Sequence, residues 1–288
     1  MATVSTEPRN FKKLLQGRWD SDARVCVGLD ADILKMDTGD LPRHSLAEMI
    51  FRRCVAVVDA TKDLALAYKP NLAFFSEVGA FNELTMLIQY INKVAPGVPV
   101  ILDAKYGDIG NTNSKYVKFA FDLNAADAVT IHATLGYEAM KPFLVDPNKF
   151  AFVLCKTSNP GSGEFQDEWV RLRNSTQKKA LGTAKEPEHA QQFELTAHNV
   201  ATTWNANGNA GLVVGATYPR QLARVRSIVG EEMWILVPGV GTQGGDVKKT
   251  VKAGGDKILV NSSSGIMFGK KSPRQEALIL TGALLAAA

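Results

Sequence analysis

Residues 98–109, which read VPVILDAKYGDI, contain the stretch that decides how this chain is interpreted. The first half is a run of apolar strand formers, and the second half is an Asp-x-Lys-x-x-Asp cluster made of Asp103, Lys105 and Asp108. Side chains two positions apart on a strand share a face, so the pattern predicts that Asp103 and Lys105 lie on the same side. A lysine held between two carboxylates at a strand end suits the delivery of a proton to a site where negative charge develops.

The composition indicates one globular unit. The chain has 288 residues, of which 45% are hydrophobic and 22% are charged, and its net charge is +4. A single α/β barrel reaches this length, so we expect one domain over residues 1–288. The mild and scattered positive charge argues against a nucleic-acid partner and suits a small anionic substrate.

Cysteine and apolar patterns bear on the compartment. Cys26, Cys54 and Cys155 are odd in number and widely spaced, so we expect buried free thiols in a reducing compartment. No apolar run approaches the ~18 residues that span a bilayer, which predicts no membrane partner. The expected location is intracellular, with the cytoplasm as first choice and an organelle left open.

Eight short apolar runs follow one another along the chain. Most are rich in Val, Ile or Leu without polar alternation, which is typical of strands buried on both faces of a parallel sheet. Stretches with helical spacing lie between several of them, at 46–64, 77–91, 192–204 and 247–253. The alternation predicts either a (β/α)8 TIM barrel or an open doubly wound sheet. The runs are 25–29, 66–69, 98–102, 128–132, 151–155, 211–215, 234–237 and 257–260.

The residues at the carboxyl ends of these runs favour the barrel. A barrel gathers all eight strand ends around one mouth, whereas an open sheet gathers a few of them at a switch point. His132 ends the fourth run, and we interpret this lone histidine as a packed or supporting residue and not as a catalytic base. The other end residues are Asp30, Lys69, Asp103 with Lys105, Thr157 with Ser158, Thr217, Pro238 with Gly239, and Asn261 with Ser262.

One connection is much longer than the others. Residues 159–192, after the fifth run, are polar and contain glycine, with few positions that look buried. Long connections of this kind in a compact domain are usually functional or solvated. We expect a lid-like insertion that covers the site and contains a short helix near 166–173. The alternative is a mobile excursion, chiefly for residues 178–188.

Six motifs, in order along most of the chain, resemble one known family. The segment DAKYGDI at 103–109, followed by Thr112, resembles the signature of orotidine 5′-phosphate decarboxylase. A surface salt bridge is the plain alternative, but the cluster follows a buried strand and contains Gly107, which permits a tight reversal. The other matching motifs are GLD at 28–30, YKPN at 68–71 with Phe74 and Phe75, TSNPG at 157–161, GLVVGAT at 211–217, and VPGVGTQGG at 237–245.

The resemblance, which is to the bacterial-type branch, implies a cofactor-independent and metal-free enzyme. It would convert orotidine 5′-phosphate to uridine 5′-phosphate and CO2 in pyrimidine biosynthesis. Asp103 would lie against the departing carboxylate, and Lys105 would stabilise the C6 carbanion and then protonate it. Lys69 would bond the ribose and hold Asp103.

The resemblance also implies a homodimer with a shared active site. Asp108 would complete the charge tetrad from the other subunit, and Ile109 and Thr112 would cross over with it. Within one subunit, Asp30 would meet the ribose. Ser158 and Pro160 would belong to the loop that reads the pyrimidine.

The glycine-rich segment 239–244 matches G-x-G-x-x-G, which alone is weak evidence for a dinucleotide site. It follows the seventh run, and no acidic residue lies ~20 positions on at the end of a following strand. A phosphate site fits better, because barrels often bind phosphate with the loops after strands seven and eight. Backbone N–H groups near Gly241 can approach an anion, and Gln243 would bridge phosphate and pyrimidine as in the family.

The chain departs from the family pattern after the eighth run. The sequence reads NSSSGI at 261–266, with Ser264 where the family usually has a phosphate-binding arginine. Loss of a charge-assisted contact costs ~1.5–3 kcal/mol, or roughly ten- to hundredfold in binding. Three explanations stay open. Arg220 or Arg274 compensates, phosphate affinity is reduced, or the serine was introduced by engineering.

Two other functions remain as alternatives. A metal-dependent sugar-phosphate decarboxylase or aldolase of the same barrel superfamily would use Asp103 as a Mg²⁺ ligand. A catalytically weakened nucleotide-binding homologue would rest on Ser264 alone. The sequence also leaves open a fusion to orotate phosphoribosyltransferase, as occurs in many relatives.

Overall fold

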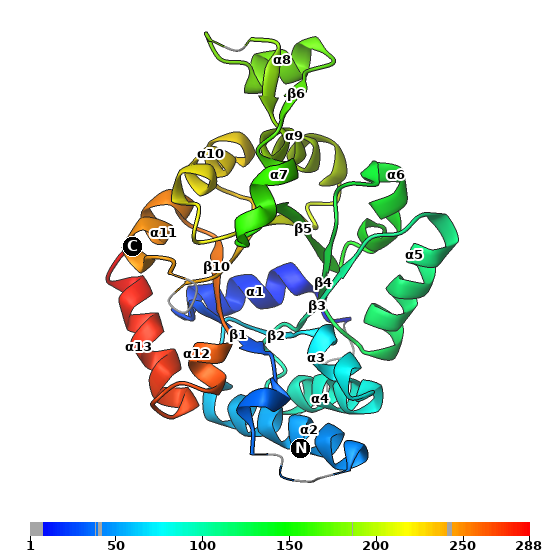
Figure 1. Ribbon diagram of the computed structural model, residues 1–288, viewed down its shortest axis with the longest axis vertical. Coiled ribbons are helices and arrows are strands. Elements are labelled where there is room, and N and C mark those ends of the chain that lie inside the picture. Colours follow the sequence, from blue (N-terminus) through cyan, green and yellow to red (C-terminus); the bar gives the residue numbers. More distant parts are fainter. Residues whose placement is uncertain (1–7, 38, 40–41, 186, 241–243) are drawn as a thin grey trace.

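The computed structural model describes residues 8–288 except 38, 40, 41, 186 and 241–243. Within this part, eight parallel strands form one sheet in the order β2-β1-β10-β9-β8-β5-β4-β3. Parallel bridges from Tyr68 to Val100 and from Asn71 to Asp103 link β2 to β3 at the two ends of this order. The sheet therefore closes into the predicted (β/α)8 barrel, and the open doubly wound alternative is wrong (Figure 1).

All eight barrel strands overlap the predicted apolar runs. Their interior is apolar because both faces are covered, by helices outside and by strand side chains inside. The third strand differs most, since it begins at Ile101 and extends to Tyr106, so that the charged cluster is part of the strand. The strands are β1 (Val25–Leu29), β2 (Ala67–Pro70), β3 (Ile101–Tyr106), β4 (Ala128–Ile131), β5 (Phe150–Lys156), β8 (Ala210–Val214), β9 (Ile235–Pro238) and β10 (Ile258–Ser262).

The predicted helices are present with shifted ends. Gly79, with a φ of 71°, interrupts the stretch 77–91, so α3 (Leu72–Glu77) ends before it and α4 (Phe81–Val94) begins after it. A π-helical turn, Val200–Trp204, continues α9 to the predicted end. The other helices around the barrel are α2 (Arg43–Thr61), α5 (Gly110–Val117), α6 (Gly136–Met140), α9 (Gln192–Asn199), α10 (Pro219–Val229), α11 (Val247–Gly254), α12 (Ser264–Met267) and α13 (Pro273–Leu285).

The amino-terminal end of the barrel is covered by α1 (Phe11–Asp20), which crosses the centre of Figure 1. Phe11 packs on Phe150 at a ring distance of 4.7 Å, and Trp19 meets Trp234 edge-on at 5.5 Å. These partners lie at or just before the first residues of β5 and β9, inside an apolar cluster that is separate from the one under the outer helices. The buried apolar residues of α1 therefore seal this end of the barrel.

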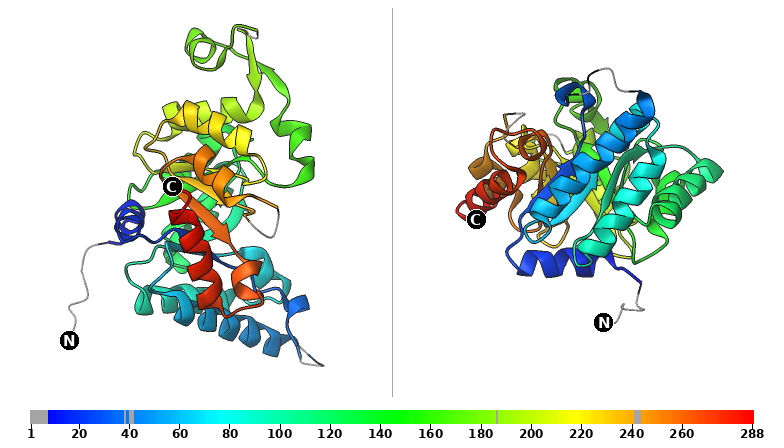
Figure 2. Two further views of the ribbon diagram at one scale, coloured as in Figure 1. Left: turned by 90° about the vertical axis from the view of Figure 1, so that its left-hand side faces the viewer. Right: turned by 90° about the horizontal axis from the view of Figure 1, so that it is seen from below.

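The long connection after β5 forms a small projecting unit (Figures 1 and 2). It contains α7 (Gly163–Gln166), β6 (Trp169–Arg171), α8 (Ser175–Leu181) and β7 (His189–Gln191), and β6 pairs antiparallel with β7. The predicted helix at 166–173 is wrong, because the β-forming pair Trp169 and Val170 finds a distant strand partner that the local pattern does not reveal. The role of a lid stays a prediction.

Two further expectations can be compared with the described residues. The three cysteines are free and buried, and burial raises the pKa of the Cys26 thiol to about 12, with smaller opposing effects from nearby charges. No helix in the described part of the chain is long and apolar enough to cross a membrane.

Candidate active site

A cleft of about 500 Å³ opens at the carboxyl ends of the barrel strands. The volume lies within the range of small-molecule sites. Most of the end residues singled out in the sequence line this cleft, which is the arrangement that a barrel predicts. The lining residues include Asp30, Lys69, Asn71, Phe74, Asp103, Lys105, Thr130, His132, Thr157, Ser158, Asn159, Gln166, Pro238, Gly239, Asn261, Ser263 and Ser264.

The centre of the cleft is a chain of charges. Lys69 Nζ lies 2.8 Å from Asp103 Oδ2, and Lys105 Nζ lies 2.7 Å from Asp103 Oδ1. Lys69 is buried at the end of β2, whereas the side chain of Lys105 is 46% exposed toward the cleft. One lysine is therefore fixed inside the protein, and the other can meet a ligand.

Lys105 reaches Asp103 through an irregularity of β3. Its φ is 51°, in the left-handed region that lysine seldom adopts, and the register of β3 against β4 shifts between Leu102 and Tyr106. The prediction that both side chains lie together is confirmed, but simple alternation is not the reason. The bulge turns Lys105 over the carboxylate, and such strain is typical of functional sites.

Thr130, on β4, supports both members of this pair. Its hydroxyl donates to Asp103 Oδ1 at 2.8 Å and accepts the backbone N–H of Lys105 at 2.9 Å. One buried side chain therefore fixes the position of the carboxylate and the strained backbone of the lysine.

The charges determine the protonation states. Burial alone would raise the pKa of Asp103, but the charges and hydrogen bonds of Lys69 and Lys105 outweigh it and hold the pKa well below its usual range. Burial would lower the pKa of Lys69, and the carboxylates of Asp103 and Asp30 reverse this and raise it. Burial, with a smaller effect from the charge of Lys105, lowers the pKa of His132 and favours its neutral form.

Asp30, which directly follows β1, extends this row of charged side chains. Its Oδ1 lies 3.9 Å from Lys69 Nζ, which is an ion pair but too long for a hydrogen bond. The same oxygen is buried with no hydrogen-bond partner among the described atoms. Since Asp30 lines the cleft, a rotation of its carboxylate would bring this unpaired oxygen to a donor that enters there.

Asp108, Ile109 and Thr112 are not among the residues that line the cleft. Asp108 Oδ1 accepts the backbone N–H of Ile109 at 2.7 Å, and the side chain of Asn113 hydrogen-bonds the backbone of Asp108. Ile109 is 63% exposed, and Thr112 is exposed as well. The structure therefore brings Lys69, Asp103 and Lys105 together within the chain and leaves the fourth predicted catalytic residue outside.

Ser158 lines one wall of the cleft, and Pro160 begins the short 3₁₀ turn Pro160–Ser162 behind it. Gln166 Oε1 accepts the backbone N–H of Thr157 at 2.8 Å, so the first helix of the projecting unit is fastened to this wall. A Cβ on Gly215 would lie 2.7 Å from the Cα of Ser158. Only glycine at 215 allows the two segments to approach this closely.

Among the described residues, no arginine lines the cleft that could replace the phosphate-binding arginine expected at Ser264. Arg274 forms a two-pronged ion pair with Asp63, with distances of 2.7 and 2.8 Å, and Arg220 is exposed. Neither arginine is among the described residues that line the cleft. Gly241 and Gln243, the predicted phosphate contacts, lie outside the described residues.

The donor set of the cleft does not suit a divalent metal ion. Both oxygens of Asp103 already accept hydrogen bonds from ammonium groups, and a metal ion there would face two positive charges. No group of three or more His, Cys, Asp or Glu residues in the described chain could hold a metal ion. Asp103 is therefore arranged as a partner of lysine and not as a metal ligand.

The sequence interpretation missed several cleft residues. Thr130 is detectable as the one polar residue of β4. Asn71 and Phe74 belong to the YKPN motif and its flank, and Gln166 to the predicted helix at 166–173, but the sequence predicts no contact for any of the three. Their positions depend on chain segments that are distant in sequence, which local patterns do not report.

Comparisons with known proteins agree with this geometry. A family model described as "Orotidine 5'-phosphate decarboxylase / HUMPS family" matches residues 23–278. A protein of Azoarcus sp. (strain BH72) named orotidine 5′-phosphate decarboxylase is 42% identical over 269 residues, covering 91% of this chain and 91% of that protein. A protein of the same name from Methylibium petroleiphilum is 42% identical over 292 residues, covering 96% and 98%.

Solved structures give the same result. OMP decarboxylase of Leishmania donovani superimposes with a TM-score of 0.78 and 34% identity, covering 96% of this chain and 98% of that one. UMP synthase of Leishmania donovani has a TM-score of 0.82 and 35% identity, covering 97% of this chain and 56% of that one. Since the family match spans most of the chain and the relatives share its full barrel, the protein belongs to the orotidine 5′-phosphate decarboxylase / HUMPS family.

Proposed function

We propose that this protein decarboxylates orotidine 5′-phosphate to uridine 5′-phosphate and CO2 without a cofactor or metal ion. The observation that carries the proposal is the Lys69–Asp103–Lys105 chain at the mouth of the barrel. Members of this family named in the comparisons are orotidine 5′-phosphate decarboxylases. The cleft is large enough for a nucleotide.

In the proposed reaction the bond between C6 and the carboxylate carbon breaks. The electron pair stays on C6, CO2 leaves, and a carbanion forms with little resonance stabilisation. The ammonium group of Lys105 is the positive charge placed where this negative charge develops, and it then donates its proton to C6. Asp103 stays anionic beside it, and Lys69 holds Asp103 in place.

The remaining predicted residues are assigned to substrate binding. Asp30, which lines the cleft, would accept a hydrogen bond from a ribose hydroxyl. Ser158 and Pro160 would face the pyrimidine. Gly241 and Gln243, together with Ser264, would face the phosphate, where serine supplies one hydrogen bond but no charge.

The proposal includes a homodimer in which Asp108, Ile109 and Thr112 complete the site of the other subunit. In support, these residues follow β3 and do not line the cleft of their own chain. The exposed side chain of Ile109 suits burial against a second copy. A fusion to orotate phosphoribosyltransferase stays a prediction.

The test is the loss of orotidine 5′-phosphate absorbance on mixing with purified protein, with and without EDTA. Rapid loss that EDTA does not change is the expected result. Activity toward a sugar phosphate that EDTA abolishes, without turnover of orotidine 5′-phosphate, would favour the metal-dependent alternative. Binding of uridine 5′-phosphate without any turnover would favour the weakened nucleotide-binding homologue.

A further inference from the structure

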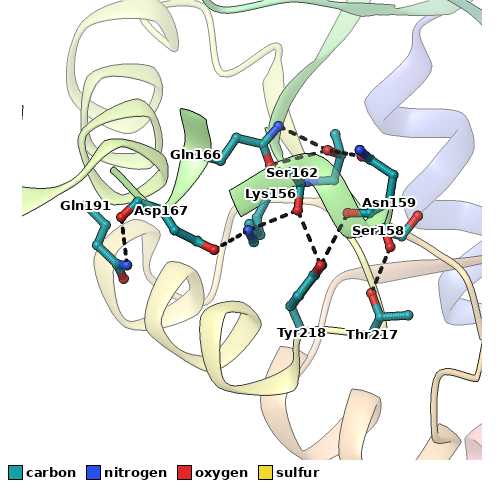
Figure 3. Close-up of polar contacts among 10 residues, drawn as sticks. Lys156, Ser158, Asn159, Ser162, Gln166, Asp167, Gln191, Thr217 and Tyr218 are labelled. Atoms are coloured by element: carbon teal, nitrogen blue, oxygen red, sulfur yellow. Dashed lines mark hydrogen bonds and ion pairs between the residues drawn. The ribbon is translucent and has the colours of Figure 1, made fainter. Parts of the chain in front are cut away.

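Lys156, the last residue of β5, is a fully buried lysine to which the proposed reaction gives no role. It is not among the residues that line the cleft, although the next residue, Thr157, is. A buried ammonium group is costly unless it is paired and hydrogen-bonded. Its surroundings, drawn in Figure 3, show what it holds.

Three groups surround the ammonium. Lys156 Nζ lies 2.8 Å from Asp167 Oδ2 and 3.0 Å from Ser162 Oγ. It also lies 4.5 Å from the centre of the Tyr218 ring, a cation–π distance. Asp167 follows α7 at the base of the projecting unit, Ser162 ends the turn that begins at Pro160, and Tyr218 precedes α10. One charge therefore joins the turn and helix that directly follow β5 to Tyr218, which lies 56 residues after Ser162.

These segments meet at residues 157–162, which we call the base loop and of which Thr157, Ser158 and Asn159 line the cleft. Tyr218 donates its hydroxyl to the backbone oxygen of Asn159 at 3.2 Å, and Thr217 donates to the backbone oxygen of Ser158 at 3.3 Å (Figure 3). The hydroxyl of Ser162 also donates to that of Tyr218 at 3.4 Å. The conformation of the base loop where it lines the cleft therefore depends on contacts with residues that do not line the cleft themselves.

We propose that Lys156 is a positioning residue, which fixes the base loop through Asp167, Ser162 and Tyr218 and so sets affinity for the pyrimidine part of the substrate. The inference rests on the proposed function, because it assigns the base loop to pyrimidine recognition. It also gives the projecting unit a task, since Asp167 and Gln166 hold the loop from the base of that unit.

A ligand without a base provides the discriminating measurement. Uridine 5′-phosphate contacts the base loop in the proposed complex, whereas ribose 5-phosphate lacks the pyrimidine. In Lys156→Met we expect uridine 5′-phosphate to inhibit at least ~10-fold more weakly, since the loss of one hydrogen bond to a ligand changes affinity by about this factor. The inhibition constant of ribose 5-phosphate should change less than about twofold.

Two controls separate positioning from general damage to the fold. Lys156→Met/Asp167→Leu removes both charges, which avoids the unpaired buried carboxylate that the single change leaves. We expect this double variant to recover thermal stability but to keep the weakened binding of uridine 5′-phosphate. Arg9→Met breaks an internal ion pair with Asp127 at the far end of the barrel. It should lower stability without changing the ratio of the two inhibition constants.

The outcomes are distinct. Wild-type affinity for uridine 5′-phosphate in the double variant, or an equal loss for both ligands, would overturn the role of Lys156. If Lys156→Met does not fold, the double variant decides the matter alone. If the wild-type protein neither binds uridine 5′-phosphate nor decarboxylates orotidine 5′-phosphate, the proposed function is wrong. The inference about Lys156 is then wrong as well.

Discussion

Replacing Thr130 by valine tests how the charge chain is held. Valine keeps the branched shape of threonine but lacks the hydroxyl that serves both Asp103 and Lys105. Loss of a hydrogen bond to a carboxylate costs about 1.5–3 kcal/mol, and leaving the Lys105 N–H without its acceptor adds about 1 kcal/mol. Burial of the extra methyl group offsets about 1 kcal/mol. We therefore expect the free energy of unfolding to fall by about 1.5–3 kcal/mol.

The change should also slow the reaction. The hydroxyl of Thr130 accepts the backbone N–H of Lys105, whose φ is in the left-handed region. Without it, we expect the ammonium group of Lys105 to be displaced from the position that the proposed proton transfer requires. We expect kcat to fall at least ~10-fold, a size typical of small misplacements at a reacting centre. The assays are urea unfolding followed by fluorescence and the decrease of orotidine 5′-phosphate absorbance.

Thr250→Val is the matched control. Thr250 is buried in α11, and its hydroxyl has no hydrogen-bond partner among the described residues. Removal of an unpaired buried hydroxyl should leave stability unchanged or raise it by about 1 kcal/mol. Equal urea midpoints and equal kcat values for the two variants would refute the reasoning, because the hydroxyl of Thr130 would then hold neither partner.

Three further predictions follow from the cleft. Lys105→Ala should abolish turnover, while calorimetry should still detect binding of uridine 5′-phosphate. The control Lys62→Ala, at an exposed ion pair, should keep both turnover and binding. Turnover of Lys105→Ala near the wild-type rate would exclude Lys105 as the proton donor. Ser264→Arg should lower KM roughly ten- to hundredfold by adding a charge-assisted phosphate contact, and an unchanged KM and kcat/KM would remove the idea of a missing contact. Asp103→Asn should be less stable than wild type above about pH 4, which is near the pKa of an aspartate in the unfolded chain. The pKa of Asp103 is lower in the folded protein, so its ionised form stabilises the fold at higher pH. This stabilisation is lost as the pH falls toward the pKa of the folded state. Urea midpoints measured from pH 7 to pH 2 should therefore converge in acid, and a gap that stays constant with pH would contradict this.

The barrel was predictable because each strand is buried on both faces and ends in polar residues or glycine. Asp30, Lys69 and Asp103 were found from their places directly after or at the ends of apolar runs, and a parallel barrel brings such ends together. The same logic located Ser158 and Ser264 at the cleft. These residues share a signal that is local in the sequence and needs no knowledge of distant contacts.

What the sequence missed depends on distant contacts. Strand alternation explained the position of Lys105 incorrectly, since the bulge that re-aims it is visible only in the pairing of β3 with β4. The strand pair β6–β7 joins residues about 20 apart, so a helical pattern was inferred for a segment that is extended. The sequence offers Arg274 as a possible phosphate contact, but its guanidinium forms an ion pair with Asp63, which is distant in the sequence.

Some expectations stay predictions. The dimer and the roles of Asp108, Ile109 and Thr112 concern a second chain. The contacts of Gly241 and Gln243 concern residues outside those described. The single-domain interpretation of 1–288 and the intracellular location also stay predictions.

The helix that seals the barrel has a consequence for the timing of folding. Phe11 and Trp19 are synthesised before their partners Phe150 and Trp234, which come well over a hundred residues later in the chain. During synthesis from the amino terminus, α1 must therefore remain undocked until most of the strands have been made. Contacts of such long sequence separation also make folding slow. The apolar face of α1 therefore stays exposed to water and to other proteins during much of synthesis, and Trp19 can dock on Trp234 only after the chain has been made as far as the start of β9.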